Sequence, residues 1–508
     1  MLRPFLLLLV VAAQVSATPG CVPRTYDSPT RLVCVCSGTK CDDIESLGTI
    51  EDGTAVIYRT EKATGKRMDR SVMQVSKTAK NKVMRLDTSE LFQEVIGFGG
   101  AFTDSAGINI AALPTKTQEL LLKQYYGPNG AEYTIGRIPM ASTDFSTREY
   151  SYCDKSGDFN LTTFGLAEED TKYKIPYILR AMELQKNTGG LKFFASPWSA
   201  PGWMKTNNRM KGGGQLKGFE GGRYYVTWAN YFVKFLEAYA SAGIPMWGLT
   251  VQNEPNTGAD PNYRWQTMYF SAEMERNFIR DQLGPALQAS KVGKDVGIII
   301  MDDQREFMPW ADIIYADEYV SSLSPGIGVH WYDDLKFPPD FLSDAHNKHP
   351  GKFILATEVI MGDFGRGESY AHSILVDMNN FAGGWTDWNI ALDPQGGPNW
   401  VQNFVDSPII VNATAGEFLK QPMYYAMMHF SKFIKPGSHR AALKVPAGLP
   451  GDVTALGLLL KDKKRAVVVL NRNETETASF SIEDAAFPGL FLNIDMPPHS
   501  IITAIWNG

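Results

Sequence analysis

The stretch "WGLTVQNEPN", residues 247–256, changes within a few residues from an apolar run to polar side chains. Pro255 has no amide hydrogen and is excluded from the middle of a sheet, so a strand over the apolar run must end near Glu254. A single glutamate at a strand end is most often simply solvated. A second stretch, "KFILATE" at residues 352–358, ends in the same way at Glu358. Whether the two glutamates meet depends on the arrangement of the strands.

Apolar runs of strand length alternate along the chain with stretches of helical period. Helical stretches such as "TKTQELLLKQYY" and "TWANYFVKFLEAYA" place apolar residues at i, i+3, i+4 and i+7. Eight alternations predict an α/β fold, a (β/α)8 TIM barrel, with a doubly wound open sheet as the alternative. The glycines near residue 97 do not complete a dinucleotide fingerprint. The eight runs are residues 95–102, 134–140, 191–198, 246–252, 295–301, 326–332, 352–358 and 382–388.

The two flanks of this region show strand patterns without a helical period. Short runs such as "TAVIYRT" near the start and "RAVVVLN" near the end are separated by turns. They predict a β-sandwich side domain built from both chain ends and packed beside the barrel. The predicted organisation is a signal peptide at 1–17, a disulfide-rich β segment at 18–45, a sandwich at 46–92 plus 436–508, and a catalytic barrel at 93–435.

Composition and charge exclude some classes of partner. The net charge is -6, and the densest basic run, "KDKKR" at 461–465, is too short for a nucleic-acid patch. Arg3, the apolar run 5–13 and the small residues at 15–17 predict a cleaved secretory signal. That apolar run is too short to span a bilayer. The mature protein is therefore expected to be secretory and to bind no nucleic acid.

Four of the five cysteines lie in one short stretch, at Cys21, Cys34, Cys36 and Cys41. In a secretory protein they predict two disulfides, with three connectivities open. Zinc is the alternative, but paired C-x-x-C knuckles are absent from the stretch. Cys153 is left over as a free thiol. Three sequons predict glycan acceptors at Asn160, Asn412 and Asn473.

The predicted barrel brings the two glutamates together. Active sites of such barrels lie at the C-terminal ends of the strands, where Glu254 ends the fourth strand and Glu358 the seventh. Two facing carboxylates can act as the acid and the nucleophile of a glycosidase. Tryptophans beside acidic residues at other strand ends, such as Trp198 and Trp388, favour a carbohydrate substrate because indole rings stack on sugar C–H faces.

No metal site and no cofactor are predicted. His346 and His349 fall in an expected surface helix, and the pair Asp302-Asp303 has no obvious partner ligand in the sequence.

Long segments of the chain resemble the lysosomal glucosylceramidase (acid β-glucosidase) family, retaining β-glycosidases of the large barrel clan. The resemblance covers nearly the whole chain after the signal peptide and includes "GFGGAFTDSA", "RIPMASTDFS", "ASPWSAPGWMKTN", "NEP", "VHWY" and "GGWTDWN". It implies that Glu254 is the acid/base, that Glu358 is the nucleophile and that Asn253 holds the sugar 2-hydroxyl. The further glucose contacts that it implies are Asp144, Trp198, Trp388 and Asn403, with Tyr332 on the nucleophile and with Arg137 and His330 in support.

The same resemblance implies bridges Cys21–Cys34 and Cys36–Cys41, and a ceramide-linked glucose as substrate. It also implies a lysosomal enzyme, reached through the secretory pathway, that works at the lumenal face of an anionic membrane with a saposin-type activator. One segment departs from the family. The segment 359–373 is about ten residues shorter than expected from the mammalian enzymes of the family. Of the family's exposed aromatic pair it keeps only Phe364, which weakens the expectation of membrane docking and activator contact.

Two other functions remain as alternatives at this point. One is another retaining glycosidase of the clan, such as a β-xylosidase or an endoglucanase. The other is a carbohydrate-binding or cargo protein without catalysis, which the presence of both Glu254 and Glu358 disfavours.

Overall fold

The structure is a computed structural model that describes residues 20–26, 28–38, 40–186, 190–359 and 366–508. The expected signal peptide, at 1–17, and Phe364 lie outside the described residues.

Eight parallel strands close into a barrel in the order β10-β11-β12-β13-β6-β7-β8-β9. The predicted TIM barrel is confirmed, and the open-sheet alternative is wrong because β6 pairs with β13 and closes the sheet. The strands are buried on both faces, which explains their continuous apolar runs. They are β6 (Gly97–Ala101), β7 (Ile135–Met140), β8 (Lys192–Pro197), β9 (Gly248–Thr250), β10 (Gly297–Gln304), β11 (Gly326–His330), β12 (Phe353–Val359) and β13 (Ala382–Asn389).

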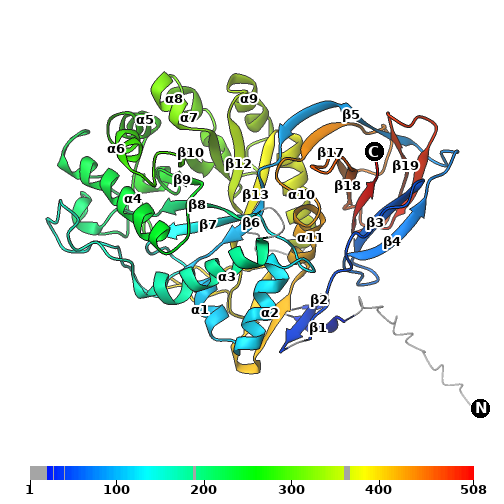
Figure 1. Cartoon of the computed structure of the whole chain (residues 1–508), viewed down its shortest axis with the longest axis horizontal. Helices are drawn as coiled ribbons and strands as arrows, with labels where there is room; N and C mark the ends of the chain where they lie inside the picture. Colours follow the sequence, from blue (N-terminus) through cyan, green and yellow to red (C-terminus); the bar gives the residue numbers. More distant parts are fainter. Residues whose placement is uncertain (1–19, 27, 39, 187–189, 360–365) are drawn as a thin grey trace, which may run out of the picture.

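Helices surround the barrel (Figure 1). In the 19-residue α4, Trp228, Phe232 and Phe235 on one face are buried while Lys234 and Glu237 are exposed enough to pair with each other. The helices are α1 (Asp104–Ala111), α2 (Thr115–Tyr126), α3 (Ile175–Gln185), α4 (Arg223–Ser241), α5 (Ala272–Phe278), α6 (Gly284–Ala289), α7 (Trp310–Ile314), α8 (Glu318–Leu323), α9 (Asp340–Lys348), α10 (Arg366–Asn379) and α11 (Pro422–Ser431).

A nine-stranded sheet built from both chain ends lies beside the barrel, as predicted for the side domain (Figure 1). It curls around its own apolar core, so that Ser76, just after one edge strand, bridges Phe491 at the start of the other edge strand. In spatial order the strands are β20 (Phe491–Met496), β19 (Ala478–Asp484), β5 (Val83–Glu94), β16 (His439–Lys444), β17 (Val453–Leu459), β18 (Arg465–Asn471), β21 (Ser500–Trp506), β3 (Thr54–Glu61) and β4 (Asp69–Gln74).

The cysteine-rich segment forms a small sheet with a late part of the chain. β1 (Val22–Tyr26) and β2 (Ser28–Ser37) pair with β15 (Glu417–Lys420) and β14 (Ile409–Asn412). Both expected bridges are present, Cys21–Cys34 and Cys36–Cys41, with Cα–Cα distances of 5.2 and 4.5 Å. Cys153 is a buried free thiol. The two bridges therefore fasten β2, which joins this segment to the barrel domain.

The sequons lie at differently exposed positions. Asn160 is exposed, whereas Asn412 and Asn473 are half-buried. The side-chain oxygen of Asn473 accepts from the amides of Thr475 and Glu476. Glycosylation at the three sites stays a prediction.

Among the described residues, no helix combines the length and the apolar character that crossing a bilayer requires.

The barrel and the nine-stranded sheet meet across α10 and α11. His429 on α11 is fully buried there, with Nδ1 2.9 Å from Thr503 Oγ1 of β21 and Nε2 2.9 Å from Thr60 Oγ1 of β3. The Thr503 hydroxyl donates its hydrogen to the His429 carbonyl, so in its contact with Nδ1 it must accept. Nδ1 therefore carries the ring hydrogen, and Nε2 accepts from the Thr60 hydroxyl. Burial lowers the pKa of His429 to about 3.

We expect His429→Gln to make the stability of the protein less sensitive to acid. In the unfolded chain His429 takes up a proton with a pKa of about 6.5, whereas in the folded protein it stays neutral down to a much lower pH. The folded state therefore has its full stability above a pH of about 6.5 and loses stability progressively as the pH falls towards the folded pKa. At pH 5 the loss is about 2 kcal/mol. Glutamine keeps a donor and an acceptor but does not titrate. Melting temperatures at pH 7 and pH 5 should therefore differ less in the variant, and an unchanged difference would contradict the assignment.

Candidate active site

The two glutamates meet at the C-terminal mouth of the barrel. Glu254 follows β9, and Glu358 lies in β12. One oxygen of each carboxylate and one ring nitrogen of His330 lie within 4.8 Å of one another. Carboxyl groups that approach each other this closely suit a retaining glycosidase, in which they lie roughly 5–5.5 Å apart, and not an inverting one, in which they lie roughly 6.5–9.5 Å apart. Both glutamates are at least nine-tenths buried, Glu254 with 8% and Glu358 with 5% of its surface exposed.

Local backbone geometry aims these side chains inward. Glu254 has a φ of 42°, in the left-handed region that a glutamate rarely adopts. Met301 and Asp302 also have positive φ values, at a register shift where β10 pairs with β11. The extra residue of this bulge turns Asp302 towards the barrel interior. Strain of this kind persists where the surrounding contacts hold the site, and here it lies at two adjacent strand ends.

Arg137 on β7 is the central cation of the site and is completely buried. Its guanidinium donates to Glu358 through Nη1 and to Asn253 Oδ1 at 2.8 Å through Nη2. Nη2 also lies 2.9 Å from Asp302 Oδ2. One rigid fork therefore fixes the positions of Glu358, Asn253 and Asp302 together.

Asp302 is the buried counter-charge to Arg137. Its two oxygens also accept from the hydroxyls of Thr250 and Thr357, each at 2.6 Å. Burial opposes its ionisation, but the charge of Arg137 and the hydrogen bond from His330 outweigh burial and hold the pKa of Asp302 below its usual value. Asp302 is therefore a fixed negative charge beneath the catalytic pair.

His330 connects this fixed charge to Glu254. Its Nε2 lies 3.0 Å from Asp302 Oδ1, and its Nδ1 lies 3.1 Å from Glu254 Oε1. Burial disfavours the charged ring, but Glu358 and the hydrogen bonds to Asp302 and Glu254 outweigh burial and raise the pKa of His330 to about 10. The ring is therefore an imidazolium at neutral and acid pH.

The remaining contacts of the two glutamates differ in kind. Glu254 accepts from the Gln304 amide at 2.9 Å and from the Tyr263 hydroxyl at 3.3 Å. Glu358 accepts from Arg137 and from the Tyr332 hydroxyl at 2.7 Å. Burial raises the pKa of Glu358, while the charges of His330 and Arg137 act in the opposite direction. Glu358 thus has a direct cationic donor, and Glu254 has neutral donors together with His330.

An aromatic wall and a carboxyl group line the neighbouring part of the mouth. The Trp198 and Trp388 rings stack with centroids 4.9 Å apart, and the Arg137 guanidinium lies 4.9 Å from the Trp198 centroid. Asp144 Oδ2 accepts from Asn403 Nδ2 at 3.0 Å and from Asn399 Nδ2 at 3.2 Å. Burial raises the pKa of Asp144 to about 7, against these two hydrogen bonds.

Strand alternation separates the aromatic residues at the end of β13. Trp388 reaches the aromatic wall, whereas Trp385 packs against Tyr370 of α10 and donates to Ser373 Oγ at 3.3 Å. Asp387 also points outward and accepts from the Tyr370 hydroxyl at 2.8 Å. Trp385 and Asp387 are therefore part of the packing between barrel and helix.

Glu254, Glu358 and His330 also make up a donor set of a type that metal sites use. Both ring nitrogens of His330 already have protein partners, Asp302 at 3.0 Å and Glu254 at 3.1 Å. The two other histidines considered in the sequence lie elsewhere. His346 stacks on Phe381, and His349 contacts Asp312.

All predicted sugar-contacting and supporting residues lie in this one region, but several further participants had no sequence signal. Asp302 was considered only as a metal ligand, although its place at the end of the fifth strand indicated the barrel mouth. Gln304 lies just beyond it on the same strand. Tyr263 and Asn399 lie on long loops, so only the folded chain brings them to the glutamates and to Asp144.

The chain is similar to glycoside hydrolases along nearly its whole length. The model of the glycosyl hydrolase family 30 TIM-barrel domain matches residues 95–434, and that of the family 30 beta sandwich domain matches residues 437–504. Lysosomal acid glucosylceramidase of Mus musculus is 43% identical, over 99% of this chain and 98% of the relative. Putative glucosylceramidase 4 of Caenorhabditis elegans is 48% identical, over 94% of this chain and 93% of the relative.

One more distant relative has a different named activity, and a solved structure shares the fold. An endo-1,6-beta-D-glucanase of Neurospora crassa is 31% identical, over 68% of this chain and 71% of the relative. The crystal structure of SrfJ from Salmonella typhimurium superposes with a TM-score of 0.82 at 26% identity, covering 90% of this chain and 100% of that chain.

Proposed function

This chain belongs to glycosyl hydrolase family 30, and from that membership and its paired glutamates we propose that it is a glucosylceramidase. It is a retaining β-glucosidase that hydrolyses glucosylceramide to glucose and ceramide by double displacement. The observation that carries the proposal is the approach of Glu254 and Glu358 within a buried, hydrogen-bonded site. Likeness to named glucosylceramidases over nearly the full chain supports the choice of substrate.

In the first step, the Glu358 carboxylate attacks the anomeric carbon while Glu254 donates its proton to the ceramide oxygen. The bond to ceramide breaks, and glucose becomes covalently attached to Glu358. In the second step, Glu254 takes a proton from water, which displaces Glu358 and releases glucose with the original β configuration. Asn253, held by Arg137, would accept a hydrogen bond from or donate one to the sugar 2-hydroxyl.

Charge balance supports this division of roles. Arg137 and His330 are two cations, and they balance two carboxylates. Asp302 is one of these two carboxylates, because five side-chain groups hold it as an anion. Glu358 is the other, since it shares Arg137 directly. Glu254, which no arginine contacts in the described structure, is left for the acid/base role.

Asp144, Trp198, Trp388 and Asn403 form the proposed glucose-binding wall. The indoles of Trp198 and Trp388 stack on each other beside the carboxyl group of Asp144, which with Asn403 can accept from and donate to hydroxyls. A sugar hydroxyl that donates to Asp144 would favour its ionised form. Tyr332, two-fifths exposed, lies at the entrance with its hydroxyl on the nucleophile.

Purified protein should release glucose from glucosylceramide at acid pH, and proton NMR of the first product should show β-glucose. Early α-glucose would contradict the assignment of Glu358 as nucleophile. The glucanase relative makes an endo-β-glucanase the second candidate function. Faster turnover of a β-1,6-linked gluco-oligosaccharide than of glucosylceramide would favour that second candidate.

We place contact with an anionic membrane at a basic and aromatic rim formed by Lys211, Arg264, Trp265 and Trp400. The Arg264 guanidinium lies 5.8 Å from the Trp265 ring centre, and Lys211 Nζ lies 5.7 Å from that of Trp400. Lys211 and Arg264 are exposed. The rim adjoins the mouth, because the Trp400 amide contacts the Asp144 carbonyl at 3.3 Å. Cations attract anionic headgroups, and indoles favour the interface.

The double variant Lys211→Glu/Arg264→Glu should lose stimulation by anionic lipid. Each cation near such a surface contributes about 1 kcal/mol, so the loss of two corresponds to about 2 kcal/mol. We therefore expect at least about a thirtyfold fall in the ratio of glucosylceramide to soluble aryl glucoside turnover on phosphatidylserine vesicles. Lys116→Glu/Lys123→Glu on α2 makes the same charge change and is the control. Equal losses in both variants would remove the rim from the proposal.

The proposed location is the lysosome, reached through the secretory pathway, at the lumenal membrane face. The mouse relative named as lysosomal and the two disulfides support it. A saposin-type activator would act at the same rim, by presenting glucosylceramide to the mouth of the barrel.

A further inference from the structure

The loop from Ala141 to Ser146 carries Asp144 between two anchored ends. Ala141 directly follows β7 and has a φ of 67°, a strained value for alanine. Asp144 itself is held on its far side by Asn399 and Asn403. A loop with a strained first residue keeps one geometry only when contacts determine both of its ends, and both ends here lead to the same lysine.

The first end is anchored through Asp170. The Ala141 amide donates to the Tyr152 hydroxyl at 2.8 Å, and that hydroxyl donates to Asp170 Oδ1 at 2.8 Å. The Tyr239 hydroxyl donates to the same oxygen at 2.6 Å. Asp170 Oδ2 accepts from the Ala167 amide at 3.2 Å. The carboxylate is completely buried.

The second end is anchored through Asp104, at the start of α1. The Ser146 hydroxyl donates to Asp104 Oδ2 at 2.5 Å and accepts from the Thr143 amide at 3.0 Å. The Tyr150 hydroxyl donates to Asp104 Oδ2 at 2.9 Å. Asp104 therefore holds the backbone amide of Thr143, the residue before Asp144, through the Ser146 hydroxyl.

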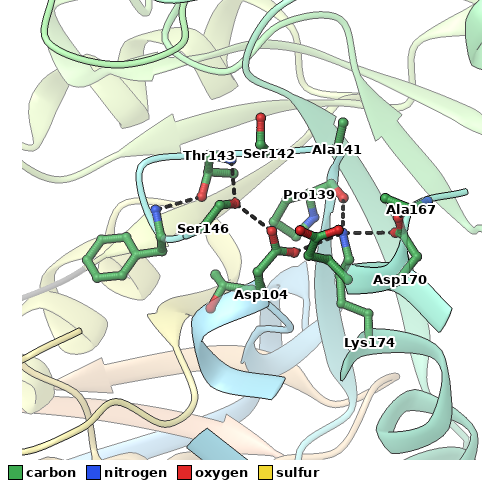
Figure 2. Close-up of polar contacts among 12 residues, drawn as sticks. Asp104, Pro139, Ala141, Ser142, Thr143, Ser146, Ala167, Asp170 and Lys174 are labelled. Atoms are coloured by element: carbon green, nitrogen blue, oxygen red, sulfur yellow. Dashed lines mark hydrogen bonds and ion pairs between the residues drawn. The ribbon is translucent and has the colours of Figure 1, made fainter. Parts of the chain in front are cut away.

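Lys174 joins the two carboxylates, as Figure 2 shows. Its Nζ lies 2.9 Å from Asp170 Oδ1 and 3.2 Å from Asp104 Oδ1, with none of its side chain exposed. It also donates to the Pro139 carbonyl on β7 at 3.4 Å. A π-helical turn, Asp170–Lys174, supplies both Asp170 and Lys174. Such turns frequently mark functional positions.

Close packing brings Asp104 to this turn. A Cβ atom on Gly107 of α1 would lie 2.0 Å from the Tyr173 carbonyl oxygen, so α1 approaches the π-helical turn only because residue 107 is glycine. The charge count requires the cation as well. Without Lys174, two buried carboxylates would face each other without compensation and would separate, hydrate or take up protons.

We propose that Lys174 is a positioning residue for glucose binding, which clamps both ends of the Ala141–Ser146 loop through Asp104 and Asp170 and thereby holds Asp144 against the sugar. The inference rests on the proposed role of Asp144 as a glucose contact. It assigns to a buried ion triad outside the catalytic mouth an effect on glucose binding that is transmitted through the loop.

The first test is a double-mutant cycle between Ser146→Ala and Asp144→Asn. Ser146→Ala breaks the Asp104 anchor without removing a charge. It should lower kcat/KM for an aryl β-glucoside by about tenfold, mainly through KM, because a misplaced Asp144 weakens binding. In the Asp144→Asn background, Ser146→Ala should change kcat/KM by less than about twofold. A merely structural role would give additive losses.

Monodeoxy glucosides extend this test to the sugar. On the deoxy-glucoside for which Asp144→Asn has its smallest effect, Ser146→Ala should also have its smallest effect, because both changes remove the same hydroxyl contact. If Asp144→Asn leaves kcat/KM unchanged for every substrate, the proposed glucose contact fails. If Asp144→Asn lowers kcat/KM but Ser146→Ala leaves it unchanged, the positioning role fails while the proposed function stands. The same holds if the losses in kcat/KM from the two substitutions are additive.

Lys174→Met tests the cation directly, with Lys420→Met as the matched control. Lys420 is also completely buried and pairs with Asp42 Oδ1 at 2.7 Å, far from this loop in the N-terminal sheet. Both variants should lower the melting temperature. Per titrated active site, only Lys174→Met should lower kcat/KM by about tenfold or more. Unchanged kcat/KM in folded Lys174→Met would overturn the proposal.

If Lys174→Met does not fold, Tyr152→Phe replaces it, because it breaks the Asp170 anchor at Ala141 without changing charge. It should reproduce the raised KM of Ser146→Ala and the same dependence on the deoxy position. A normal KM in Tyr152→Phe would then reject the clamp.

Discussion

Glu358→Gln is expected to lose nearly all activity, by at least about 10⁴-fold in kcat, on every glucoside. Glutamine keeps the size of the side chain and can still accept from Tyr332 and Arg137, but its amide cannot form the covalent glucosyl intermediate. A substrate with a good leaving group should not restore activity, because the missing group is the nucleophile. The measurement is kcat on glucosylceramide and on a dinitrophenyl glucoside.

Glu61→Gln is the matched control for that substitution. Glu61 is a buried glutamate of β3, with 4% of its surface exposed, and it pairs with Arg59 at 3.8 Å outside the barrel. Glu61→Gln should keep the kcat of the folded enzyme, whatever its melting temperature. Substantial turnover by Glu358→Gln would show that the nucleophile has been misassigned.

Glu254→Gln is expected to fail in a different way. Without a general acid, turnover of glucosylceramide should fall by about 10²–10⁴-fold, the usual contribution of proton transfer. A dinitrophenyl leaving group needs no proton, so this variant should still form the intermediate on Glu358. The intermediate should then accumulate, because no base activates water.

Azide distinguishes the two roles. It needs no general base, so it should accelerate turnover of the dinitrophenyl glucoside by Glu254→Gln and give a β-glucosyl azide. Each displacement inverts the anomeric carbon, and two inversions retain its configuration. If azide instead rescued Glu358→Gln to a β-azide and left Glu254→Gln unchanged, the two roles would have to be exchanged.

The pH profile should reflect the same assignment. Activity requires an ionised Glu358, whose pKa burial raises, so activity should fall on the acid side as that carboxylate takes up a proton. Tyr332→Phe removes one hydrogen bond that favours the ionised form. The acid limb of kcat/KM in this variant should therefore move to higher pH.

Much of the fold followed from local pattern. The eight apolar runs of the barrel are separated by helical periods, and each run became a strand within a few residues of its expected bounds. Pro255 predicted a strand end near Glu254, and β9 ends four residues before that glutamate, at Thr250. Once a parallel barrel was expected, the strand ends of Glu254 and Glu358 placed both at one mouth.

Other features escaped a pattern-based prediction. β16 and β20 were not singled out in the sequence, and β14 and β15 were expected within the barrel range although they pair with the N-terminal segment. Partner choice in such sheets depends on long-range packing, which period-two patterns do not specify. Trp385 and Trp388 both lie at the end of β13, but strand alternation sends Trp385 to α10 and Trp388 to the mouth.

The sequence by itself therefore determined the class of chemistry. Two glutamates at barrel strand ends, beside tryptophans, favour glycoside hydrolysis over other reactions. Only the tertiary structure decided how these groups are tuned. The bulge at Asp302, the fork of Arg137, the imidazolium of His330 and the clamp by Lys174 join residues from strands and helices far apart in the chain. Electrostatic effects depend on distance and burial in the folded state, and neither is encoded in local periodicity.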